Sequence, residues 1–126
     1  MLEELGQNIT LPSPDHHKIL RMLQIPDSEY DAVLREQIDR CSLEVLRSAS
    51  PRAVLRILPV EEILPVFRGH DIRRLLEGCA EAVLMALTLG SDLEKRLMRE
   101  EVTNLSNAYV MDVCASLAVE DAADAL

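Results

Sequence analysis

Hydrophobic residues gather in one stretch of this chain, which runs from Gly78 to Gly90 and carries Glu81 as its single charge. The stretch is too short for a membrane span, which needs about 20 apolar residues. Because almost every position is apolar, periodicity alone does not distinguish a buried helix from a buried strand. The segment Val83-Leu84-Met85 and the exit Thr88-Leu89-Gly90 tolerate a strand, whereas the alanines favour a helix. We interpret the stretch as a buried core strand.

Two helices are predicted ahead of this strand. Ser13 or Asp15 is positioned to cap the first helix, which ends before Pro26. Asp27 or Ser28 is positioned to cap the second helix, which continues to about Ala49 and is ended by Ser50-Pro51. Apolar residues recur with helical spacing in both helices: Ile19, Leu20, Met22, Leu23 and Ile25, then Val33, Leu34, Ile38, Cys41, Leu43, Val45 and Leu46.

Prolines divide the segment between these helices and the apolar stretch. Branched apolar residues predict a strand from Arg52 to Leu58. Pro59 and Pro65 bracket a second short extended piece, Val60–Leu64, and such prolines confine strands to sheet edges or connections. Asp71 is then positioned to cap a short helix over residues 72–77.

Two further helices are predicted after the apolar stretch. In the first, which extends to about residue 101, Ser91 and Glu94 have the spacing of a capping box. Its expected buried stripe is Leu93, Leu97 and Met98. Thr103 or Asn104 is positioned to cap a long last helix that is rich in small residues. Small residues allow close approach of another backbone or of a ligand, and we favour a helix that lies flat on the sheet.

These elements predict an α+β fold with a small mixed or antiparallel sheet flanked by helices. The sheet is expected to contain Arg52–Leu58 and Gly78–Leu89, with two helices on its N-terminal side and a long C-terminal helix. A length of 126 residues suits one domain spanning residues 1–126, and a hydrophobic content of 48% is ordinary for a globular protein.

The charge balance excludes some partners. A net charge of −9 argues against nucleic acid, because phosphate binding needs clustered Lys and Arg. Tyr30, Phe67 and Tyr109 are the only aromatic residues, so stacking platforms for bases are scarce. No membrane segment is predicted, and without a signal peptide or basic start the expected compartment is the cytoplasm.

Candidate catalytic and metal-binding residues are sparse. Cys41, Cys79 and Cys114 are far apart and form no Cys-x2-Cys pair, so each is expected to be a buried, reduced thiol. His16 and His17 are adjacent and point to different sides of a helix, so we expect solvated side chains. The chain has no Gly-x-Ser-x-Gly elbow and no glycine-rich phosphate loop. No catalytic residue and no metal site is predicted.

Two motifs nevertheless carry a family resemblance. The pattern Cys-x5-Met-Ala-x-Thr-Leu-Gly spans residues 79–90, and Asp112 and Glu120 give an Asp-x7-Glu pattern in the last helix. Over residues 15–126 the chain resembles the activation domain of cobalamin-dependent methionine synthase. It is more closely similar to the short stand-alone bacterial proteins related to that domain.

The resemblance implies a ligand. That domain binds S-adenosylmethionine and presents it to cobalamin in methionine synthase, so that reductive methylation rescues the oxidised cofactor. By the Asp-x7-Glu pattern, Glu120 is the residue of this chain that would contact the ligand. A carboxylate suits S-adenosylmethionine, which carries a sulfonium and an ammonium charge. The alternative is that Glu120, with Asp121 and Asp124, solvates a helix end.

The sequence departs from the family in one respect. The family motif Arg-x-x-x-Gly-Tyr, which holds most of the ligand, is absent up to Leu126. We therefore expect an incomplete domain that binds S-adenosylmethionine weakly or not at all by itself and meets cobalamin only through a partner. The expected partners are methionine synthase modules or a missing C-terminal segment, and homo-oligomers are left open. Catalysis by this chain alone is not expected. The alternative function is a non-catalytic interaction scaffold that has lost the ligand site.

Overall fold

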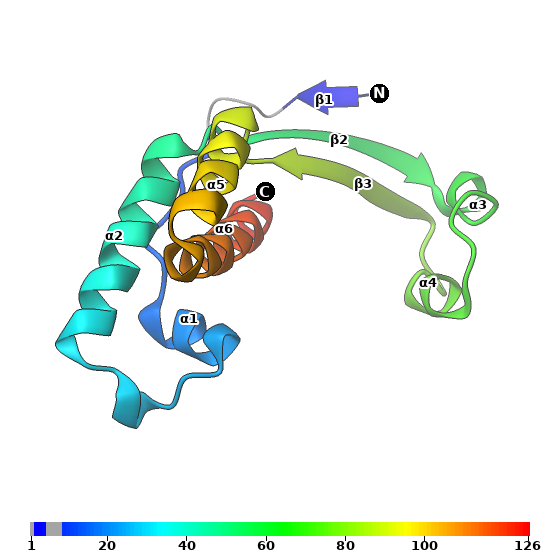
Figure 1. Ribbon diagram of the computed structural model, residues 1–126. Helices are drawn as coiled ribbons and strands as arrows, with labels where there is room; N and C mark the ends of the chain where they lie inside the picture. The colour runs from blue at the N-terminus through cyan, green and yellow to red at the C-terminus, as the bar shows by residue number, and fades with distance from the viewer. Residues whose placement is uncertain (1, 5–8) are drawn as a thin grey trace.

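The computed structural model describes residues 2–4 and 9–126 and combines helices with one antiparallel sheet, which confirms the predicted α+β fold. Figure 1 shows the longer helices gathered at one end of the molecule, with long strands extending away from them. The elements in chain order are β1 (Leu2–Glu4), α1 (His16–Leu23), a 3-10 turn (Asp27–Glu29), α2 (Ala32–Ser48), β2 (Arg52–Pro59), α3 (Val60–Ile63), α4 (His70–Leu75), β3 (Glu81–Thr88), α5 (Ser91–Thr103) and α6 (Leu105–Asp124). We call α1, α2, α5 and α6 the helical body, and β2, β3, α3 and α4 the arm.

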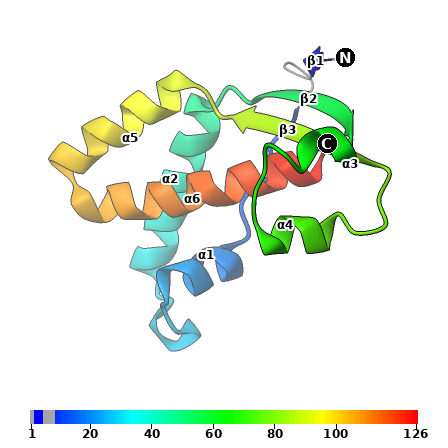
Figure 2. The same ribbon diagram turned by 90° about the vertical axis from the view of Figure 1, so that its right-hand side faces the viewer.

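Helix α6 forms the centre of the helical body and confirms the predicted long C-terminal helix. Figure 2 shows it running past α2 and α1, while α5 folds back on it as a helical hairpin. Its small residues let these helices approach closely. The interpretation of α6 as a helix flat on the sheet was wrong, because its main contacts are with α2 and α5. The body core comprises Ile19, Leu20, Ile38, Cys41, Val45, Leu89, Leu93, Val110, Met111, Val113, Cys114, Ala115, Leu117 and Ala118.

The two predicted N-terminal helices are present, and the structure corrects one cap. Asp15 caps α1 as predicted, since its Oδ1 accepts the N–H of His17 at 2.9 Å. Helix α2 is capped by Asp31, whose Oδ1 accepts the N–H of Leu34 at 2.8 Å. The predicted caps Asp27 and Ser28 belong instead to a separate 3-10 turn. An extended backbone at Asp31 separates that turn from α2.

The histidines also differ from the prediction. His16 is not solvated: its side chain is mostly buried, its Nδ1 lies against the Tyr30 hydroxyl, and its Nε2 is 2.8 Å from Asp39 Oδ1. Tyr30 precedes α2 and Asp39 lies within it, so His16 joins α1 to α2. His17 is exposed, as predicted.

Three local predictions in the second half of the chain were wrong. Residues 60–63 form α3 and not an extended piece: Pro59 lies at the N-cap position, and the following Glu61 and Glu62 favour the N-terminus of a helix. Asp71 and Ser91 do not cap α4 and α5, since glycine occupies the cap position of each helix without a side-chain bond. Asn104 does cap α6, with its Oδ1 accepting the N–H of Asn107 at 3.1 Å.

The sheet has the strand order β1-β2-β3, and both pairs are antiparallel. In β2 and β3, Arg52 lies opposite Thr88 at the body end, and Pro59 lies opposite Glu81 at the far end. A hydrogen bond of 2.7 Å from the Ser50 N–H to the Leu89 carbonyl fastens the base of this hairpin. Next to it, Gly90 has a φ of 96°, and a Cβ at this position would lie 3.3 Å from Ser50. Glycine is therefore required where β3 joins α5.

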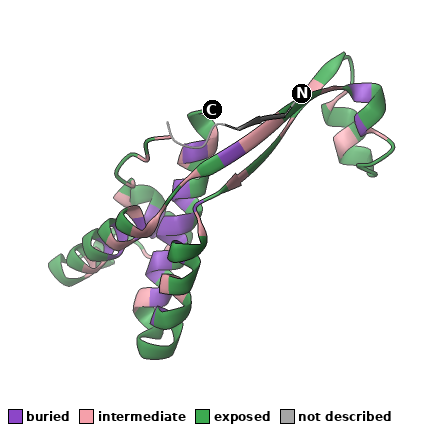
Figure 3. Cartoon of the chain, turned by 90° about the horizontal axis from the view of Figure 1, so that it is seen from above, coloured by how far each residue is buried: buried purple, intermediate pink, exposed green. Residues whose placement is uncertain are grey.

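The strand β3 confirms the predicted strand, but it is not a core strand. Val83 and Met85 are 58% and 44% exposed, and no residue of Glu81–Thr88 is buried. Figure 3 shows buried residues along α6 and few in the arm. Because β2 and β3 project beyond the helical body, the body covers only their base, while α3 contacts both strands at the far end. The apolar composition of the stretch was identified correctly, whereas its burial was not.

Candidate functional site

The exposed apolar surface of the arm lies on one face of the β2–β3 hairpin. Side chains alternate between the faces of a strand, so Leu55 and Ile57 share a face with their cross-strand partners Met85 and Val83. Burial falls along this face with distance from the helical body: Ala53 is buried, Leu55 is half-buried and Ile57 is 52% exposed. The result is an apolar strip that no other described element covers at the far end of the arm, a feature typical of interaction surfaces.

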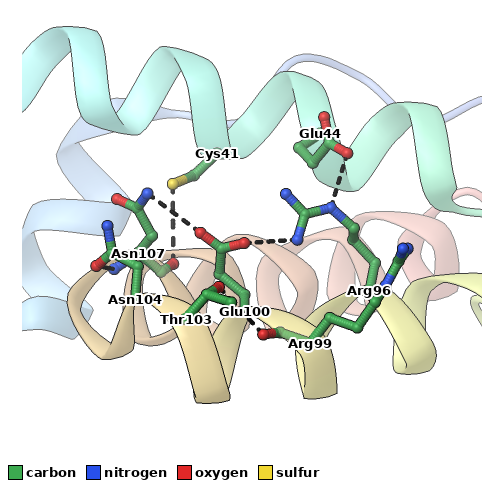
Figure 4. Close-up of polar contacts among 8 residues, drawn as sticks. All are labelled: Cys41, Glu44, Arg96, Arg99, Glu100, Thr103, Asn104 and Asn107. Carbon is green, nitrogen blue, oxygen red and sulfur yellow. Dashed lines mark hydrogen bonds and ion pairs between the residues drawn. The ribbon is translucent and has the colours of Figure 1, made fainter.

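A partly buried polar cluster joins the three longest helices of the body (Figure 4). Arg96 on α5 donates from Nε to Glu44 on α2 at 2.9 Å and from Nη1 to Glu100 at 2.5 Å. Glu100 also accepts a hydrogen bond of 3.2 Å from Asn107 Nδ2 on α6, and Asn107 Oδ1 accepts one of 2.8 Å from Gln37 on α2. These bonds fix the relative positions of α2, α5 and α6.

The electrostatics of this cluster favour its charged form. The hydrogen bond from Arg96 holds the pKa of Glu100 below its usual range, and the bond to Glu100 raises the pKa of Arg96 in turn. Glu100 is only 9% exposed, so the pairing compensates the cost of burying its charge. The i,i+4 spacing of Arg96 and Glu100 was the one signal of this cluster available in the sequence.

Beside this cluster, α2 and α5 border an open depression of about 960 Å³. Its lining contains two acidic residues, Glu44 and Asp92, and four basic ones. The basic residues are Arg47, Lys95, Arg96 and Arg99. A local excess of positive charge in a chain of net charge −9 attracts anionic groups. Met98 also lines this depression and is 65% exposed, so its predicted place in the buried stripe was wrong.

The predicted site residue Glu120 lies on the exposed side of α6, near its C-terminal end. Within residues 2–4 and 9–126 its side chain makes no hydrogen bond or ion pair, and the last turn of α6 contains no basic residue. Asp121 and Asp124 are its acidic neighbours on this helix. The carbonyl end of a helix carries a partial negative charge, so acidic side chains there repel it and favour a cation nearby. The arrangement suits a cationic group, and equally it suits solvation of the helix end.

The three cysteines lie in two different environments. Cys41 and Cys114 are buried in the helical body, as predicted, and Ser42 Oγ lies 3.5 Å from the Cys114 sulfur. Burial raises the pKa of Cys41 to about 11 and also raises the pKa of Cys114. Cys79 is exposed, against the prediction, because it lies between α4 and β3 at the far end of the arm.

Neither a metal centre nor a membrane span is found in the described part of the chain. No group of three or more His, Cys, Asp or Glu side chains among those residues is arranged to hold a metal ion. Likewise, no helix among them is long and apolar enough to cross a membrane.

Comparison with known proteins gives no family assignment: no protein-family model and no curated protein matches the sequence.

Proposed function

We propose that this chain is an accessory module resembling the activation domain of cobalamin-dependent methionine synthase. In this role Glu120 contacts S-adenosylmethionine, and the module supports reductive methylation of cobalamin bound by a partner. The observation that carries the proposal is an exposed carboxylate without a cationic partner among the described residues, on the acidic end of α6. The motif residues 79–90 and Asp112 support the same assignment.

The module is expected to need a second segment to bind the ligand well. The sequence lacks Arg-x-x-x-Gly-Tyr, so Glu120 offers one charge interaction at an exposed position where water screens it. Charge-assisted and bidentate contacts contribute a few kcal/mol, so their absence lowers affinity by about two to three decades. Methionine synthase modules, or another segment that carries the motif, are the proposed source of the missing contacts.

Isothermal titration calorimetry with S-adenosylmethionine tests this proposal in two titrations. One uses the chain alone, and the other uses the chain mixed with a segment containing Arg-x-x-x-Gly-Tyr. We expect weak or undetectable binding alone and measurable binding with the segment. Glu120→Gln is then expected to weaken that binding by about tenfold or more, because it removes the charge attraction. Glu101→Gln, at an exposed carboxylate on α5, is the matched control and is expected to change nothing.

Each other outcome contradicts a defined part of the proposal. Micromolar binding by the chain alone would show that the second segment is dispensable. Restored binding that is insensitive to Glu120→Gln would remove Glu120 from the site. Absence of binding in both titrations would rule out S-adenosylmethionine as the ligand.

The exposed apolar strip on β2 and β3 favours a second candidate, a non-catalytic interaction domain. In that case the arm binds a partner protein, and S-adenosylmethionine has no part in the complex. Linkage distinguishes the candidates, because a ligand bound by the module must change its affinity for a partner that contributes to the same site. The affinity for a cobalamin-binding methionine synthase module, measured with and without S-adenosylmethionine, should differ under the first proposal and coincide under the second.

A further inference from the structure

The outer edge of β3 presents backbone groups for pairing. The Val60 N–H donates to the Ala80 carbonyl at 3.0 Å, and this pair continues the register of β2 and β3. Hydrogen-bonded and non-hydrogen-bonded pairs alternate along antiparallel strands. Ala82, Leu84 and Ala86 therefore bond to β2, while the N–H and C=O groups of Val83 and Met85 face outward. Leu87, at the next alternate position, faces outward too.

This edge lacks the features that usually protect an edge strand. Natural proteins guard such edges with Lys, Pro, bulges or covering elements. Strand β3 is eight residues long, has no Lys or Pro, and carries its single charge, Glu81, at its first position. In the described part of the chain, no backbone hydrogen bond from another element reaches Val83, Met85 or Leu87. The side chains of the same three residues lie on the exposed apolar face.

We propose that β3 pairs antiparallel with β3 of a second copy of this chain, so that the two sheets become one continuous sheet across a two-fold axis. Outward-facing residues must meet outward-facing residues, which restricts the register. The register that pairs Val83 with Met85 of the other copy, and Glu81 with Leu87, keeps all of residues 81–87 within the interface. Its two-fold axis passes through Leu84.

The charges and the shape of the arm fit pairing with a second copy of this chain. Antiparallel pairing places the two Glu81 carboxylates at opposite ends of the interface, where a parallel arrangement would set like charges side by side. It also brings the exposed far end of each arm beside the base of the other arm, where α6 packs on β3. The most exposed part of the strip, Ile57 and Val83, thus lies next to the partner's helical body. The same surface of each copy is used twice, since the far end of each arm meets the base of the other copy's arm, as a two-fold interface requires.

The net charge of −9 on each copy opposes this association at long range. Salt screens such repulsion over about 10 Å at 0.1 M. The dimer is therefore expected to become tighter as the salt concentration rises, opposite to an interface held by complementary charges. This proposal does not depend on S-adenosylmethionine binding and stands or falls separately.

Analytical ultracentrifugation combined with residue-resolved hydrogen exchange tests the dimer. We expect a monomer–dimer equilibrium that tightens with salt, with amide protection at Val83 and Met85 rising with protein concentration and Leu84 protected throughout. Val83→Lys is expected to raise the dimer dissociation constant by about 100-fold, because it places a charge at the pairing edge. Val102→Lys, at a valine of α5 that is 87% exposed, is the matched control and should leave the equilibrium unchanged.

Two results would overturn the proposal. The first is a chain that stays monomeric at high concentration and high salt, which would assign the edge to a different polypeptide. The second is a dimer in which Val83 and Met85 exchange as fast as in dilute monomer, which would place the interface elsewhere. Circular dichroism of Val83→Lys shows whether the variant is folded, and hydrogen exchange on the unmodified chain gives a result that does not depend on any variant.

Discussion

The helical body and the arm both contain apolar stretches, yet they differ in how much of this apolar surface they bury. In the body, α6 is surrounded by α1, α2 and α5, and residues such as Met111 and Cys114 are almost fully buried. In the arm, Val83 and Met85 lie in the longest apolar stretch of the chain and remain about half exposed. Burial thus depends on how many layers a region has, and β2 and β3 form a single layer beyond the body.

The difference in burial also separates the region that stabilises the fold from the region that is available for interaction. The close packing of small residues on α6 ties the helices of the body together. The arm contributes little buried area to the folded monomer and keeps its apolar strip available. Substitutions in the two regions are therefore expected to have different consequences.

The largest expected effect is in the body core. Ile38→Ala should lower the free energy of unfolding by about 2–5 kcal/mol, because Ile38 is fully buried and its truncation leaves a cavity. The control is Val33→Ala on the same helix, where the side chain is 77% exposed and the expected change is within about 0.5 kcal/mol. Chemical denaturation measures both, and similar midpoints for the two variants would contradict the assignment of the core.

Thiol labelling compares the two regions directly. At pH 8, Cys79 in the arm should react with a thiol reagent at least about 100-fold faster than Cys41 and Cys114 in the body. Burial hides the two body thiols, and a pKa of about 11 leaves about one Cys41 in a thousand as thiolate at that pH. Cys79→Ser should remove the fast phase. A fast phase that persists in this variant would show that the body opens readily.

The polar cluster should show an intermediate effect. Arg96→Ala is expected to cost about 1–3 kcal/mol, because it leaves the Glu100 carboxylate buried without its strongest donor. Lys95→Ala, at the adjacent exposed residue of α5, is the control. Thermal or chemical unfolding measures both, and an equal loss in the two would mean that the cluster adds no stability beyond helix propensity.

The pH dependence follows from the same cluster and should be smaller. The pKa of Glu100 is lowered in the folded state, so its stabilising contribution is fully present above the ordinary glutamate pKa of about 4.3 and is lost as the pH falls through the lower folded value. Glu100→Gln should therefore flatten the decline of unfolding free energy below about pH 5, by about 1 kcal/mol. Unfolding curves from pH 7 to pH 3 test this. A steeper decline in the variant would reverse the sign and contradict the pairing.

The smallest effect is expected at the far end of the arm. Leu75→Ala on α4 should change the unfolding free energy by no more than about 0.5 kcal/mol, because the side chain is 74% exposed. The change should be measured at a concentration at which the chain is monomeric. A loss of several kcal/mol there would show that α4 packs against the body and that the arm is not a separate region.

Sequence patterns predicted the secondary-structure elements better than they predicted which elements pack together. Helical spacing and proline positions correctly located α1, β2 and α6, because these signals act within a few residues. The caps at Asp71 and Ser91 were wrong, because Gly69 and Gly90 adopt the turn geometry that starts those helices. The burial of β3 was also wrong, since an apolar stretch does not reveal whether another layer exists to cover it.

The candidate site was less accessible from sequence for the same reason. Glu120 was identified through a motif, and its exposure is a structural fact that the motif does not contain. The bonds from Arg96 to Glu44 and from Gln37 to Asn107 join residues more than 50 positions apart, which no local pattern reports. The outward direction of the Val83 and Met85 amides could be derived only from the strand register seen in the structure.

The arm extends from a joint at Ser50 and Gly90, so a small rotation at this joint would move the far end of the arm by a large distance. Eight strand residues at about 3.3 Å each place the far end of the arm about 26 Å from this joint. A tilt of about 10° at the joint would then displace α3 and α4 by about 5 Å, while the same tilt moves the adjoining residues by a fraction of that distance. Gly90 has no side chain, and a Cβ there would lie 3.3 Å from Ser50, so a substitution at this position would disturb the point where the arm joins the helical body. A partner bound at the far end of the arm would therefore experience a small tilt at the joint as a large change in position.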